Sequence, residues 1–176
     1  MEQTAALEVL RRTRVEVPSW AYGNSGTRFK VFAQPGVPRD PFEKLADAAQ
    51  VHRFTGAAPS VSLHIPWDAV DDYGKLAAHA ADLGVRIGMI NSNTFQDDDY
   101  KLGSLCHHDE RVRAKAVAHM LECVDIMDVT ASRDLKIWLP DGLNYRTVEV
   151  RSNGLRITMT GKNVNVRRGQ LAGGTC

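Results

Sequence analysis

The sequence lacks the features that would place it in a membrane or secreted class of protein. It has no unbroken apolar stretch near the roughly 20 residues that a membrane span needs. Its first residues, from Met1 to Val15, mix acidic and basic side chains where a signal peptide would be apolar. Its three cysteines, Cys106, Cys123 and Cys176, are too few and too scattered for a disulfide framework. We therefore expect a cytoplasmic protein with no membrane partner.

An excess of charge of either sign is also missing, because 22 basic residues face 21 acidic ones. This balance leaves no electrostatic footprint for a polyanion, so we expect no nucleic-acid partner. The sequence contains no Gly-rich dinucleotide or phosphate loop, no H-E-x-x-H, no catalytic serine motif and no paired cysteine site. Its 176 residues, 43% of them hydrophobic, are enough for a sizeable core.

Strand and helix patterns alternate along the first 145 residues. Strand patterns cover Val15–Trp20, Pro59–Trp67, Val85–Ile90 and Asp134–Leu139. Helix patterns cover a short peripheral segment at 5–14, then 40–56, 68–84 and 109–130, with Asp40, Asp68 and Asp109 at the cap positions. The apolar or semi-apolar face of the second helix is expected to comprise Phe42, Leu45, Ala49, His52 and Phe54. Because each crossover can hold a helix, the pattern predicts a parallel sheet in an α/β fold.

The residues at the strand ends favour a β/α barrel over an open sheet. An open doubly wound sheet would usually place a Gly-rich phosphate loop after its first strand. In a barrel, functional residues sit at the carboxyl ends of the strands, and Trp20, Trp67 and Trp138 all lie at or just beyond such ends. The pattern predicts about the first four βα units of a (β/α)8 TIM barrel.

Aromatic rings and one histidine at these ends suit a sugar. Sugar C–H faces pack on indole rings while the hydroxyls need polar partners; the alternative is that the tryptophans are core residues. His64 is the candidate for proton chemistry, because it can accept from a hydroxyl or, when protonated, donate to a ring oxygen. A lone strand histidine is more often a core or rim residue, but Trp67, three positions later, favours the functional interpretation here.

Other polar clusters favour local structure over chemistry. The run from Asn91 to Thr94 can bind hydroxyls, although a turn is favoured for at least two of its residues. The run from Asp97 to Asp99 favours a solvated loop over a metal site, because adjacent side chains diverge. The pair His107-His108 favours a loop or helix entry. No metal ligand is predicted within this chain.

From Tyr145 onward the alternation stops. Short β-like alternations follow, but no helix covers the fourth strand. We therefore divide the chain into a half-barrel domain, residues 1–145, and a tail, residues 146–176, with an irregular or β-like structure. We expect the tail to be poorly ordered.

Several segments resemble the bacterial L-rhamnose isomerase family, over about Val15 to Tyr145. The segments are V-P-S-W at 17–20, G-T-R-F at 26–29, V-S-L-H-I-P-W-D at 61–68, M-I-N-S-N-T-F at 89–95, Y-K-L-G-S-L at 100–105 and L-E-C at 121–123. S-L-H-I-P-W-D followed by N-S-N-T-F at this separation is a specific combination. The tail departs from the family, as the product of a reading-frame shift would.

The resemblance implies a barrel of the xylose-isomerase type that converts L-rhamnose to L-rhamnulose by a hydride shift between C1 and C2, with two divalent cations, typically Mn²⁺. Carried over by position, His64 is the residue that contacts the sugar ring oxygen and helps to open the ring. Trp20, Trp67, Phe95 and Trp138 shape the substrate pocket. The family's metal ligands come from later strands, none of which this chain contains.

We therefore expect an aldose–ketose isomerase chain that is inactive by itself. Half a barrel exposes sheet edges, which favour association. The alternatives are a non-catalytic half-barrel that forms a homo-oligomer or pairs with a separate second half, and a sugar-binding module.

Overall fold

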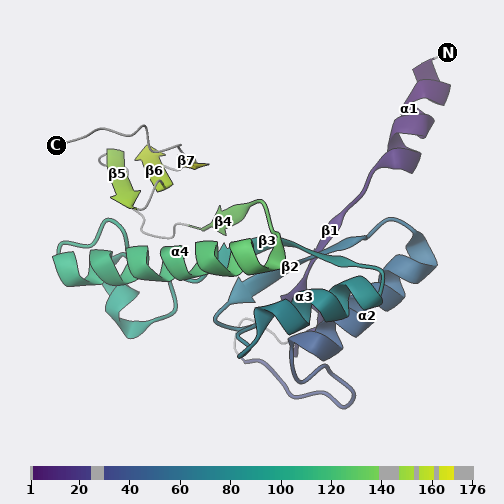
Figure 1. Ribbon diagram of the computed structural model, residues 1–176, viewed down its shortest axis with the longest axis horizontal. Coiled ribbons are helices and arrows are strands. Elements are labelled where there is room, and N and C mark those ends of the chain that lie inside the picture. The colour runs from purple at the N-terminus through teal and green to yellow at the C-terminus, as the bar shows by residue number, and fades with distance from the viewer. Residues whose placement is uncertain (1, 25–29, 139–146, 153–154, 161–162, 169–176) are drawn as a thin grey trace. The chain divides into compact units, whose positions relative to one another are not determined.

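A computed structural model describes residues 2–24, 30–138, 147–152, 155–160 and 163–168 (Figure 1). The chain divides into two compact units. The first comprises Met1–Asn91 and Asp125–Asp134, and the second comprises Ser92–Val124 and Leu135–Cys176. Each unit has buried hydrophobic residues of its own.

Four strands form one parallel sheet in chain order: β1 (Glu16–Pro18), β2 (Ser60–Ile65), β3 (Arg86–Ser92) and β4 (Leu135–Ile137). Glu16 of β1 pairs with Ser60 of β2, and Pro18 pairs with Ser62. Every residue of β2 is buried, as expected for a parallel strand that is covered on both faces. The predicted α/β fold with a parallel sheet is confirmed, and closure into an eight-stranded barrel stays a prediction.

The described α-helices lie where the sequence predicts helices, and those after the first connect the strands. The α-helices are α1 (Glu2–Arg12), α2 (Pro41–Thr55), α3 (Tyr73–Asp82) and α4 (Glu110–Thr130), and two short 3-10 helices are η1 (Ser19–Tyr22) and η2 (Asp98–Leu102). The Asp40 carboxylate caps α2 by accepting from Glu43 N at 3.0 Å. Gly56 ends the helix with a φ of 65°, which glycine adopts without a steric penalty. Among the described residues, no helix has both the length and the hydropathy of a membrane span.

The core of the first unit lies between β2, β3 and the helices α2 and α3, which pack against each other (Figure 1). Its fully or nearly fully buried apolar side chains are Leu45, Ala48, Ala49, Val61, Leu63, Ile65, Leu76, Ala80, Ile87 and Ile90. Phe54 corrects the predicted face of α2, because its side chain is 80% exposed. It follows Ala49 by five positions, which rotates it by about 140° around the helix and away from the buried face.

The second unit has a smaller core around α4. Tyr100, Leu105, Ala116 and Met120 are buried together. Partly buried apolar residues pack against them, namely Val112, Val117, Leu121, Val124, Leu135 and Ile137. The helical spacing predicted for 109–130 is thus the spacing that buries Ala116 and Met120.

Several predicted element ends differ from the structure by a few residues, and two of these differences have a clear physical reason. The first strand ends at Pro18, two residues before the predicted Trp20, because proline has no N–H for the strand ladder and the chain turns into η1. Helix α3 is capped by Asp72, whose carboxylate accepts from Lys75 N at 2.9 Å. Asp68, the predicted cap, is instead fully buried.

The described residues of the tail form three antiparallel strands, β5 (Thr147–Ser152), β6 (Leu155–Thr160) and β7 (Asn163–Arg168), in that order. Thr147 pairs with Thr160, and Leu155 pairs with Arg168. The predicted β-like alternations therefore correspond to strands. The division at 145/146 and the expected poor order of the tail stay predictions, and Tyr145 lies outside the described residues.

Two large apolar residues of the first unit should contribute very differently to its free energy of unfolding. Leu63→Ala removes a fully buried side chain from β2 and should lower the free energy of unfolding by about 2–5 kcal/mol. Phe54→Ala truncates an exposed ring and should change it by less than about 0.5 kcal/mol. Urea titration followed by far-ultraviolet circular dichroism measures both values. Equal effects of the two substitutions would contradict the described packing.

Candidate functional site

Three predicted site residues meet where β1 and β2 end. The imidazole of His64 stacks on the indole of Trp67, with ring centroids 3.7 Å apart and planes 15° apart. Trp20, in η1 directly after β1, lies edge to face with His64 and with Trp67, with ring centroids 5.3 and 6.4 Å apart. We call these three residues the aromatic–histidine cluster. The structure thus brings together the predicted proton-transfer residue and two of the four predicted sugar-contacting rings.

Burial divides the cluster into an inner histidine and two outer indoles. His64 is only 6% exposed, whereas Trp20 and Trp67 are 37% and 43% exposed. The indoles therefore offer apolar faces to a ligand from solvent, while His64 lies beside them with polar ring nitrogens. This combination of a stacking surface and a proton donor or acceptor is what a sugar with a reacting oxygen requires.

No role in the site was predicted for Asp68 from the sequence, although its carboxylate is hydrogen-bonded to the backbone of His64. Its side chain is fully buried, and Oδ1 accepts from Lys44 Nζ of α2 at 2.6 Å. Oδ2 accepts from the backbone N of His64 at 2.7 Å and from the hydroxyl of Ser19. One sequence signal could have indicated this role. Asp68 follows His64 by four residues, in a turn that contains Pro66, and it lies too far before α3 to cap that helix.

The other two predicted rings form a pair in the second unit. Phe95 and Trp138 contact each other edge to face, with ring centroids 4.7 Å apart and planes 78° apart. Trp138 directly follows β4 and is 60% exposed. The pair therefore combines a partly exposed indole with a supporting phenyl ring, as a stacking surface would.

The polar run at the end of β3 is buried and serves the backbone. Asn91 Nδ2 donates to Leu63 O at 2.8 Å. Asn93 Oδ1 accepts from the backbone N of Phe95 and of Gln96, at 3.3 and 3.1 Å, which is a turn of the kind predicted for this run. Asn93 thereby fixes the turn that carries Phe95.

His119 of α4 supports the same turn. Its Nε2 accepts from Asn93 N at 3.1 Å, so this nitrogen carries the lone pair, and Nδ1 lies 3.0 Å from Glu122 Oε2. Cys123 Sγ lies 3.9 Å from Nε2. Burial raises the pKa of the Cys123 thiol to about 12, so this cysteine is a packed thiol rather than a nucleophile.

The acidic run from Asp97 to Asp99 pairs with a lysine. Lys115 Nζ of α4 lies 2.7 Å from a carboxylate oxygen of each of Asp97 and Asp99, and their hydrogen bonds raise the lysine's pKa. Asp109 begins α4 by accepting from Arg111 N at 2.8 Å, and hydrogen bonds from Arg111 lower the pKa of its carboxyl to about 2. Both groups therefore organise the entry to α4.

The manganese that the family resemblance implies finds no donor set in the part of the chain that the structure describes. No group of three or more His, Cys, Asp or Glu side chains there could hold a metal ion. Asp68, the fully buried carboxylate, is already engaged by a lysine, a hydroxyl and a backbone N–H. The described residues thus do not fit a metal, and we assign no chemical step to one.

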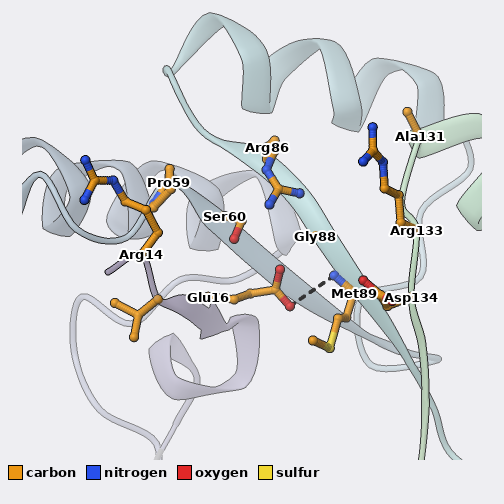
Figure 2. Close-up of a pocket in the computed structure, with 11 residues that line it drawn as sticks. Arg14, Glu16, Pro59, Ser60, Arg86, Gly88, Met89, Ala131, Arg133 and Asp134 are labelled. Carbon is orange, nitrogen blue, oxygen red and sulfur yellow. Dashed lines mark hydrogen bonds between the residues drawn. The ribbon is translucent and has the colours of Figure 1, made fainter. Parts of the chain in front are cut away.

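A cavity of about 670 Å³ lies at the opposite ends of the strands (Figure 2). It is lined by Arg14, Val15, Glu16, Pro59, Ser60, Arg86, Gly88, Met89, Ala131, Arg133 and Asp134. Glu16 and Ser60 are the first residues of β1 and β2, whereas His64 is near the end of β2. The cavity is therefore distinct from the aromatic–histidine cluster.

The side chain of Glu16 extends from β1 across this cavity to β3 (Figure 2). Its Oε1 accepts from Met89 N at 3.1 Å, and a Cβ atom on Gly88 would overlap the same carboxylate. Gly88 is therefore the residue that lets the Glu16 side chain lie against β3.

Two known proteins are similar to most of this chain. A probable sugar isomerase of Rhizobium meliloti is 47% identical over 136 residues, which are 74% of this chain and 32% of the relative. A probable sugar isomerase of Mesorhizobium japonicum is 44% identical over 136 residues, which are 74% of this chain and 31% of the relative. The chain thus spans about a third of the length of these relatives. No protein-family model matches it.

The close approach at Gly88 predicts a coupling between two residues. Gly88→Ala should displace the Glu16 carboxylate, break its hydrogen bond to Met89 N, and lower the free energy of unfolding by about 1–2 kcal/mol. In a Glu16→Ala background no carboxylate is displaced, so Gly88→Ala should cost less than about half as much. A double-mutant cycle by urea unfolding measures the coupling. Additive effects of the two substitutions would contradict the described geometry.

Proposed function

We propose that this chain is the sugar-contacting part of an aldose–ketose isomerase that acts on L-rhamnose or a closely similar sugar. The aromatic–histidine cluster carries the proposal, because it places a buried imidazole beside two partly exposed indoles at the carboxyl end of a parallel strand. The similarity to two probable sugar isomerases supports the same class of reaction.

In this proposal, the indoles of Trp20 and Trp67 pack on the C–H faces of the sugar. Their partial exposure leaves ring surface for a ligand, and their contacts with His64 keep that surface next to the imidazole. Packing of this kind excludes water from one side of the sugar and orients its ring oxygen.

His64 then acts on the ring oxygen and on the C1 hydroxyl of the sugar, as the bond between C1 and the ring oxygen breaks. Opening a cyclic aldose requires a proton at the ring oxygen and loss of the proton on the C1 hydroxyl. A protonated imidazole can donate the first proton, and a neutral one can accept the second. The open-chain aldose that results is the form in which hydrogen can move between C1 and C2 to give the ketose.

The proposal extends beyond the described sheet in two respects. The four parallel strands are the first part of a (β/α)8 barrel, and the edge-to-face pair of Phe95 and Trp138 is a second surface on which a sugar can stack. The complete isomerase resembles metal-dependent enzymes, but the described residues provide no ligand set, so His64 and the aromatic rings are the groups assigned here.

Sugar binding to the cluster is the first test. The full chain should bind L-rhamnose with a Kd on the order of 1–10 mM, and saturation-transfer NMR should show the sugar C–H protons in contact with aromatic rings. Trp67→Ala should weaken binding by about ten-fold, because it removes the ring that stacks on His64.

Phe54→Ala is the matched control for this test, since it truncates an aromatic ring that is 80% exposed in the same unit and outside the cluster. Its Kd should equal that of the unchanged chain. Equal loss of affinity in both variants, or no rhamnose binding by the unchanged chain, would refute the proposed site.

Turnover is the second test. The isolated chain should not convert L-rhamnose to L-rhamnulose in the presence of Mn²⁺, because the described residues offer a binding wall and one proton-transfer group but no ligands for the ions that the family resemblance implies. The assay measures ketose formation against a control without protein. Ketose formation above that control would show that the chain has a complete catalytic site.

A further inference from the structure

We propose that Asp68 is the positioning residue of the aromatic–histidine cluster, and that Lys44 and Ser19 hold it in place. The inference rests on the proposed function, because it explains how His64 and the two indoles are held in the arrangement that would bind a sugar. Its geometric content can be measured without any sugar.

The carboxylate of Asp68 joins three elements of the first unit. Lys44 Nζ on α2 donates to Oδ1 at 2.6 Å, and the Ser19 hydroxyl on η1 donates to Oδ2. The backbone N of His64, on β2, also donates to Oδ2 at 2.7 Å. A single side chain therefore fixes the ends of β1 and β2 relative to the helix that covers them.

The bonds between His64 and Asp68 run in both directions. His64 N donates to the Asp68 carboxylate, and Asp68 N donates to His64 O at 2.8 Å. This closed loop contains Trp67, whose ring stacks on the imidazole. The loop therefore fixes the backbone positions from which the two stacked rings extend.

Trp20 is linked to this network through the preceding residue, Ser19. Ser19 is fully buried and is bonded to Asp68, and the next residue is Trp20, which meets the edge of His64. All three members of the aromatic–histidine cluster are thus either bonded to Asp68 or adjacent in sequence to a residue of that network. Sequence adjacency makes the network a direct constraint on the rings.

Lys44 compensates the negative charge of the buried Asp68 carboxylate. Asp68 is fully buried, and a buried charge is stable only when it is paired and hydrogen-bonded. The Lys44 side chain is 13% exposed, so the pair is inside the unit rather than on its surface. A second pair, Asp72 with Lys75, lies nearby in sequence with side chains that are 50% and 79% exposed, and provides a matched control.

The stack of His64 on Trp67 has a spectroscopic signature. A protonated imidazole in contact with an indole quenches its fluorescence, so the pH dependence of tryptophan emission reports this contact. The chain has three tryptophans, and Trp138→Phe leaves only the two of the cluster as reporters. His64→Gln in that background removes the imidazole and therefore gives the emission without quenching by His64.

In the full chain carrying Trp138→Phe, Asp68→Asn and Lys44→Met should each reduce the pH-dependent quenching by about two-fold or more, because the network that holds the rings together acts as a unit. Lys44→Arg, which keeps the charge, should restore the quenching. Asp72→Asn and Lys75→Met should leave it unchanged. Measurements are made at urea concentrations where circular dichroism shows each variant folded.

A purely structural role predicts a different result. In that case the variants would lower the urea midpoint while the folded protein kept its full quenching amplitude, and this outcome would overturn the proposal. If Asp68→Asn does not fold, Ser19→Ala carries the test, since it removes one hydroxyl and leaves the ion pair. Unchanged quenching in both Ser19→Ala and Lys44→Met would also overturn it. Because no sugar is present, failure here is separate from failure of rhamnose binding.

Discussion

The Asp68 carboxylate, which has no exposed surface, accepts hydrogen bonds from Lys44, Ser19 and the His64 backbone. A charge in this position must keep all its partners, because an unpaired buried carboxylate is strongly unfavourable. Its requirement for partners therefore constrains the ends of β1 and β2 and the helix α2 together. The geometry of the aromatic–histidine cluster depends on this constraint.

The two ends of the parallel sheet differ in chemistry. At the carboxyl ends, a buried ion pair supports a histidine and two partly exposed indoles. At the amino ends, the cavity is lined by arginines and by Glu16, which is bonded to the backbone of β3 over Gly88. In parallel α/β sheets ligands bind outside the carboxyl ends of the strands, and this difference agrees with the proposal that the cluster is the site.

Much of the fold could be predicted from local patterns. The capping acid Asp40, the closing Gly56 and the helical spacing that buries Ala116 and Met120 each act within a few residues, so the sequence pattern is sufficient. The exposure of Phe54 and the early end of the first strand at Pro18 were predicted wrongly. Phe54 lies about 140° around the helix from Ala49, and Pro18 cannot donate to the strand ladder, so in both cases the local geometry overrode the apolar or strand-like pattern.

For the site, the sequence by itself determined the candidate residues: one histidine and several aromatic rings at strand ends, with a pattern that resembles sugar isomerases. Only the tertiary structure decided that His64 stacks on Trp67 and that Asp68 serves this pair instead of capping α3. The physical reason is that an aspartate before a helix satisfies the same local pattern in either role. The choice depends on Lys44 and Ser19, which lie 24 and 49 residues away in sequence, and no local pattern records that they meet.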